Sequence, residues 1–113
     1  MGEEDRIQQE CYMWFHNNLR HLRGLLFSIP NGGKRDPITA KILKSTGLVP
    51  GVSDMMFIFD SKAYCLECKT ENGRQSNVQK IWEYNVTGGF GKAYYKIFRN
   101  LEEFKVIIYE IIK

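Results

Sequence analysis

Apolar residues recur at helical spacing near the start of the chain. Between Glu4 and Leu22 they are three or four residues apart, which predicts an amphipathic helix with one buried face. Asp36 followed by Pro37 is typical of a capped helix start, and Gly47 is typical of a helix end. The first part of the chain is therefore expected to contain two helices.

Short apolar runs bounded by turn residues predict strands. They lie at 25–29, 55–59, 63–69 and 94–98. The runs at 55–59 and 63–69 are separated by a short polar turn, which predicts a β-hairpin. Further helices are expected after Ser76, ending at the glycines of 88–91, and after Asn100. The pattern predicts the α/β order α-β-α-β-β-α-β-α.

Length and composition restrict the class of protein. A chain of 113 residues with 43% hydrophobic and 26% charged residues is expected to form one globular domain over 1–113. The apolar run Met55–Phe59 is far shorter than the roughly 20 residues of a membrane span. Acidic Glu3, Glu4 and Asp5 do not suit a signal peptide, and the cysteine count of 3 is odd. We therefore expect a cytoplasmic protein without membrane partners.

Positive charge is concentrated in the middle of the chain. Residues 34–99 contain 11 Lys and Arg against 6 Asp and Glu, whereas the formal net charge of the whole chain is only +3. A phosphate-rich partner would account for this bias, and so would an ordinary solvated face. Charge alone leaves both readings open.

The predicted hairpin brings chemically useful side chains together. Glu67 and Lys69 are two residues apart and so project to the same side of a strand. Asp54 precedes the first hairpin strand, which places it opposite the end of the second. Two carboxylates, a carbonyl and water can hold Mg²⁺, and a neighbouring lysine can orient water or neutralise phosphate charge. This arrangement predicts phosphodiester hydrolysis.

Two further polar residues permit two interpretations each. Glu10 lies at the edge of the apolar face of the first helix, where a carboxylate needs a metal, a basic partner or a water-filled cleft. Gln79 lies three residues after Ser76, the position of a capping-box glutamine. A cap explains Gln79 without function, and we expect its side chain to serve a cap and a site only one at a time.

Other chemistry is less well supported. Cys65 and Cys68 form a C-x-x-C motif, but they face opposite sides of a strand and no second ligand pair completes a zinc site. His16 and His21 are about 140° apart around a helix and are poor co-ligands. Neither zinc nor thiol redox chemistry is expected.

A longer set of motifs resembles the VRR-NUC family, the virus-type replication-repair nucleases of the PD-(D/E)xK superfamily. The resemblance spans nearly the whole chain. Its motifs are Pro30-Asn31-Gly32-Gly33-Lys34-Arg35, Gly47, Gly51-Val52-Ser53-Asp54, Glu67-Cys68-Lys69, and Gln79 with Trp82. It implies a restriction-endonuclease-like fold with a central mixed four-stranded sheet flanked by helices. Ser53 departs from the superfamily's proline, which removes a rigid turn residue but no ligand.

The resemblance implies a metal-dependent endonuclease that uses Mg²⁺ or Mn²⁺. The implied roles are metal ligands for Asp54, Glu67 and the carbonyl of Cys68, catalytic lysine for Lys69, and supporting polar residues for Glu10 and Gln79. Stand-alone family members of this size are similar to homodimeric enzymes that cut branched DNA, including four-way (Holliday) junctions, in DNA repair. The resemblance also implies a phage or bacterial origin. These are expectations about this chain.

The basic middle of the chain supplies candidate DNA contacts. They are Lys34, Arg35, Arg74 and Lys80, on predicted turns or helix starts beside the proposed site. A non-catalytic nucleic-acid-binding module is the alternative. Such a module would retain its affinity for DNA when divalent metal is removed, whereas the nuclease would need the metal.

Overall fold

The computed structural model describes residues 1–30 and 35–113, and it has the predicted order of elements. Residues 31–33 of the predicted turn at 30–33 lie outside the described residues, and so does the candidate contact Lys34. The elements are α1 (Glu3–Asn18), the 3-10 turn η1 (Arg20–Leu22), β1 (Leu26–Ser28), α2 (Pro37–Ser45), β2 (Met55–Phe59), β3 (Lys62–Cys68), α3 (Asn77–Thr87), β4 (Tyr94–Phe98) and α4 (Leu101–Ile112).

Within the described residues, the strands form the predicted mixed sheet, and their order in it is β1-β2-β3-β4. β1 and β2 are antiparallel, β2 and β3 form the antiparallel hairpin, and β3 and β4 are parallel. The hairpin turns at Asp60 and Ser61, which both have positive φ, the backbone that a tight two-residue turn requires. The α/β fold class with helices on both sides of a mixed sheet is confirmed.

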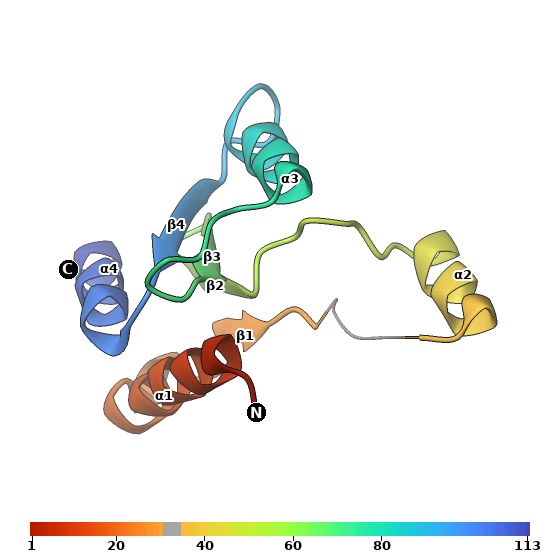
Figure 1. The fold of residues 1–113 in the computed structure, drawn as a ribbon. Coiled ribbons are helices and arrows are strands. Elements are labelled where there is room, and N and C mark those ends of the chain that lie inside the picture. The colour runs from red at the N-terminus through yellow and green to blue at the C-terminus, as the bar shows by residue number, and fades with distance from the viewer. Residues whose placement is uncertain (31–34) are drawn as a thin grey trace.

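Helices α1 and α4 cover one face of the sheet, and α3 lies on the other side (Figure 1). The first face is apolar because alternate strand residues project to it. Phe15 of α1, Leu66 of β3 and Phe104 of α4 are at most 1% exposed. The core therefore lies between the sheet and α1 and α4, and the α3 face is left for other side chains.

The first helix is shorter than predicted. It ends at Asn18 rather than Leu22, and η1 follows it. The Asn18 side-chain amide donates to the Trp14 carbonyl at 2.8 Å, and Arg23 Nε donates to the His16 carbonyl at 2.9 Å. The Arg23 side chain thus satisfies a carbonyl of the last turn that a continuing helix would use.

Helix α2 stands apart from the other helices and the sheet (Figure 1). It begins as predicted, because Asp36 accepts a hydrogen bond from the Thr39 backbone N–H at 2.9 Å. Yet none of its residues is buried, and Ile38 and Ile42 are 74% and 56% exposed. Over residues 1–30 and 35–113, no helix has the length and apolar character of a membrane span.

Candidate active site

The hairpin brings Asp54 to the end of β3. Met55 pairs with Leu66, so Asp54 falls opposite Glu67 one position further along. Asp54 Oδ2 accepts a hydrogen bond from the Cys68 backbone N–H at 2.8 Å, and the Asp54 carbonyl accepts one from the Ile29 N–H at 2.8 Å. Both bonds fix the aspartate at the strand end, and the juxtaposition predicted from the hairpin is observed.

The side chains at the end of β3 alternate as predicted. Glu67 and Lys69 share one side, and Glu67 Oε2 lies 3.5 Å from Lys69 Nζ. Cys68 projects to the other side, where its thiol lies 3.5 Å from the Glu4 carbonyl of α1. Lys69 follows the last strand residue, and its backbone N–H still donates to the Phe98 carbonyl of β4 at 3.1 Å. The sheet therefore positions the carboxylate and the ammonium directly.

Gln79 connects this pair to the start of α3. Its Nε2 donates to Glu67 Oε2 at 3.1 Å, while its Oε1 accepts from Lys69 Nζ at 2.9 Å and from the Ser76 N–H at 2.8 Å. The Ser76 hydroxyl accepts from the Gln79 N–H at 3.3 Å, which completes a capping box. The expectation that the side chain serves only one role at a time was wrong, because its two amide ends point to different partners.

Glu67 is buried, and its surroundings disfavour the charged form of its carboxyl group. It is 1% exposed, and burial, followed by the neighbouring Asp54 carboxylate, raises the pKa of Glu67 to about 8 against the opposing effect of Lys69. Glu67 Oε1 is buried and has no hydrogen-bond partner in the described part of the chain. A buried carboxylate oxygen without a partner, next to a second carboxylate, suits a divalent cation, which would satisfy both.

The donor set for such a cation is small. In residues 1–30 and 35–113, no group of three or more His, Cys, Asp and Glu side chains is arranged to hold a metal ion. Asp54 and Glu67 would therefore bind it with backbone and water oxygens. The Cys68 N–H points to Asp54, and in an extended strand the carbonyl of the same residue points to the same side. This is consistent with the predicted contact from the Cys68 carbonyl.

The loop after Lys69 is held by Arg99, which the sequence analysis did not single out. One guanidinium nitrogen of Arg99 donates to the carbonyls of Thr70 at 2.6 Å, Glu71 at 3.2 Å and Gly73 at 2.8 Å. These are charge-assisted bonds to a segment that leads from the lysine to the α3 cap. Only the residue type, an arginine just after a strand, was visible in the sequence.

Glu10 does not join the cluster. It is exposed on α1, and its carboxylate has no hydrogen bond or ion pair with the residues that the structure describes. It lies one turn before Trp14, whose ring packs on Phe104 and Tyr109 of α4, so this side of α1 faces α4. Of the environments that the sequence left open for Glu10, the structure has exposure to water, and this geometry gives its predicted catalytic role no support.

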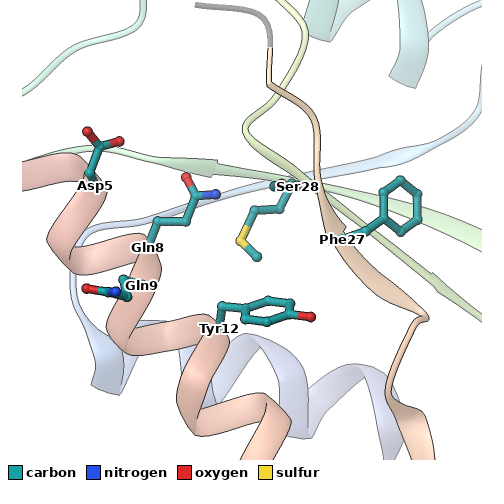
Figure 2. Close-up of a pocket in the computed structure, with 7 residues that line it drawn as sticks. Asp5, Gln8, Gln9, Tyr12, Phe27 and Ser28 are labelled. Atoms are coloured by element: carbon teal, nitrogen blue, oxygen red, sulfur yellow. The ribbon is translucent and has the colours of Figure 1, made fainter.

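Other α1 side chains lie nearer to the strand that follows Asp54. A hollow of about 430 Å³ between α1 and β1 is lined by Gln8, Tyr12 and Met55, among others, and Figure 2 shows Gln8 and Tyr12 projecting into it from α1. Gln8 is partly buried, and it shares a helix face with buried Cys11. That spacing was the signal that could have predicted that Gln8 is more buried than Glu10.

A second hollow, of about 380 Å³, lies on the α3 side and includes Asp54 and Gln79 in its lining. The predicted DNA contacts Arg35, Arg74 and Lys80 are exposed, and their side chains form no hydrogen bond or ion pair with described residues. Their cationic groups are available to a ligand.

The fold can now be compared with known proteins. A solved structure named VRR_NUC domain protein superposes with a TM-score of 0.79 over 99% of this chain and 89% of that chain, at 15% sequence identity. The chain has the VRR-NUC fold. No protein-family model and no curated protein matches the sequence. The VRR-NUC fold confirms the predicted restriction-endonuclease-like arrangement of the sheet and its helices.

Proposed function

We propose that residues 1–113 act as one metal-dependent endonuclease domain that hydrolyses DNA phosphodiester bonds. The observation that carries this proposal is the convergence of Asp54, Glu67, Lys69 and Gln79 at one strand end, with a buried carboxylate oxygen of Glu67 left without a partner. The name of the structural neighbour, VRR_NUC domain protein, supports a nuclease.

Asp54 and Glu67 would hold Mg²⁺ or Mn²⁺ together with the Cys68 carbonyl. When bound, a divalent ion supplies Lewis-acid stabilisation of the phosphoryl oxygens and lowers the pKa of water. Binding would also remove the repulsion between the two carboxylates, which favours the charged form of Glu67. The metal-bound site is therefore expected to lose the proton that Glu67 holds without metal.

Gln79 and Glu67 hold the Lys69 ammonium in place, and we expect it to take part in the hydrolysis. Its ammonium has three N–H donors, and Gln79 Oε1 and Glu67 Oε2 occupy two directions. The third can hydrogen-bond the attacking water or a phosphoryl oxygen. In the reaction the water oxygen forms a bond to phosphorus, the bond from phosphorus to the leaving oxygen breaks, and that oxygen gains a proton. Lys69 would stabilise the negative charge that develops on phosphate.

The basic middle of the chain supports DNA as the substrate, with Arg35, Arg74, Lys80 and Lys34 as phosphate contacts. Selectivity for branched DNA such as four-way junctions, and assembly as a homodimer, follow from the resemblance to VRR-NUC nucleases. Two sites in a symmetric dimer would suit a symmetric junction.

The test is cleavage of labelled four-way junction, flap, linear duplex and single-stranded DNA with Mg²⁺, with Mn²⁺ and with chelator, beside a Glu67→Ala variant. We expect metal-dependent cutting, strongest on the junction and absent in the variant. Binding without cutting under every metal condition would favour the non-catalytic nucleic-acid-binding module instead.

A further inference from the structure

The groove beside Asp54 is lined by side chains of different chemical character. Lys44 at the end of α2, Val49 and Val78 of α3 line it together with Asp54 and Gln79, which belong to the candidate active site. The valines are each 46% exposed. The groove therefore combines the proposed reaction centre with a cation and two apolar side chains that water still contacts.

Local backbone structure sets the position of the segment that follows Lys44. The Leu48 N–H donates to the Leu43 carbonyl at 2.8 Å, which ties the segment after α2 to the end of that helix. Gly51 then has a φ of +85°, and a Cβ at this position would lie 2.5 Å from the Val78 carbonyl oxygen. Only glycine permits this close approach, so the segment stays against α3 and the groove keeps its shape.

Lys44 and Lys69 differ in exposure and in whether the ammonium group already has a partner. The Lys69 side chain is 8% exposed, and its ammonium already contacts Gln79 and Glu67. The Lys44 side chain is exposed, and its ammonium forms no hydrogen bond or ion pair within residues 1–30 and 35–113. A polyanion that approaches Asp54 meets negative charge, so an unpaired cation that lines the groove lowers the electrostatic cost of its entry.

We propose that this groove binds the nucleotide next to the scissile phosphate, with Lys44 contacting its phosphate and Val49 and Val78 packing on its sugar. This inference rests on the proposed function and names a substrate contact of the same site. It assigns Lys44 a role in binding DNA and none in the chemical step. The chain offers a matched control, because Lys41 is exposed on the same helix but does not line the groove.

The experiment measures DNA binding in Ca²⁺ over a range of salt concentrations, for the unaltered protein, Lys44→Ala, Lys44→Arg and Lys41→Ala. Lys44→Ala is expected to weaken binding about tenfold and to reduce the salt slope by about one phosphate contact. Lys44→Arg should bind like the unaltered protein, and Lys41→Ala should change affinity less than about twofold.

A neutral-phosphate scan then locates the contact. Methylphosphonates are placed one at a time around the mapped cleavage position. Substitution of the phosphate next to the cut should weaken binding by the unaltered protein about tenfold and have no further effect on Lys44→Ala. Equal losses in both proteins at every position would overturn the inference, as would equal affinities of Lys44→Ala and Lys41→Ala. The proposed function fails separately, if the unaltered protein binds DNA but does not cut it with Mg²⁺ or Mn²⁺.

Discussion

The end of β3 and helix α2 have opposite mismatches between side chain and environment. Glu67 and Lys69 are polar but are 1% and 7% exposed, whereas Ile38 and Ile42 of α2 are apolar but 74% and 56% exposed. Each mismatch opposes folding, since buried charge is costly and exposed apolar surface forgoes burial. The comparison teaches that each region lacks a partner that would offset its mismatch: the proposed cation and phosphate in one case, and a second surface in the other.

The largest expected effect comes from the buried region. Lys69→Ala should lower the cleavage rate about 10³-fold, because it removes the only cation that is hydrogen-bonded within the cluster of described residues. DNA binding should stay within about threefold, since Lys69 is buried. Single-turnover cleavage and binding in Ca²⁺ measure the two effects, with Lys62→Ala at the exposed start of β3 as the control. Full activity of Lys69→Ala would remove the lysine from the mechanism.

Substitutions of Gln79 and Ser76 distinguish the contribution of Gln79 to the candidate site from its contribution to the helix cap. Gln79→Ala removes hydrogen bonds to Glu67, to Lys69 and to the Ser76 backbone, so it should lower kcat on the order of 10-fold to 100-fold and also destabilise the fold. Ser76→Ala removes only the cap acceptor and should lower the free energy of unfolding by about 1 kcal/mol, with kcat nearly unchanged. Cleavage kinetics and urea denaturation distinguish the two; an equal fall of kcat in both variants would mean that Gln79 acts only through the cap.

Much of this arrangement was predictable from short-range patterns. The caps at Asp36 and Asn100 and the opposition of Asp54 to Glu67 were predictable because each depends on residues near in sequence or on the hairpin register. The hydrogen bond from Gln79 to Glu67 was not, because it depends on where α3 lies against β3.

The features that the sequence did not predict have the same physical origin. Helical spacing placed Glu10 at the edge of an apolar stripe, but it could not tell whether α4 or the sheet would face that edge. Similarly, the apolar residues of α2 predicted a helix but not that it would remain uncovered. Periodicity indicates which side chains share a face, and only the tertiary structure shows what that face meets.

The buried carboxylate also predicts a pH dependence of stability. The pKa of Glu67 is about 8 in the fold against an ordinary value of 4.5, so between these pH values the folded protein keeps a proton that the unfolded chain has released. Rising pH therefore destabilises the metal-free protein through this window, and the full effect is present above about pH 8. Urea midpoints in chelator should fall from pH 6 to pH 9 more for the unaltered protein than for Glu67→Gln, and Mg²⁺ should restore stability at pH 9. Parallel pH curves for the two proteins would contradict the burial argument.

Substitutions on helix α2 are expected to have the smallest effect on the stability of a single chain. Ile38→Ser with Ile42→Ser should change the free energy of unfolding of the monomer by less than about 0.5 kcal/mol, because neither side chain is buried. If a second copy covers this face in the proposed homodimer, the same substitutions should weaken dimerisation about tenfold, which sedimentation over a range of concentrations measures. Phe15→Ala, which empties a buried position, is the contrast and should cost about 3–5 kcal/mol. A dimer unaffected by the two serines would place the interface elsewhere and leave the exposed isoleucines to another partner.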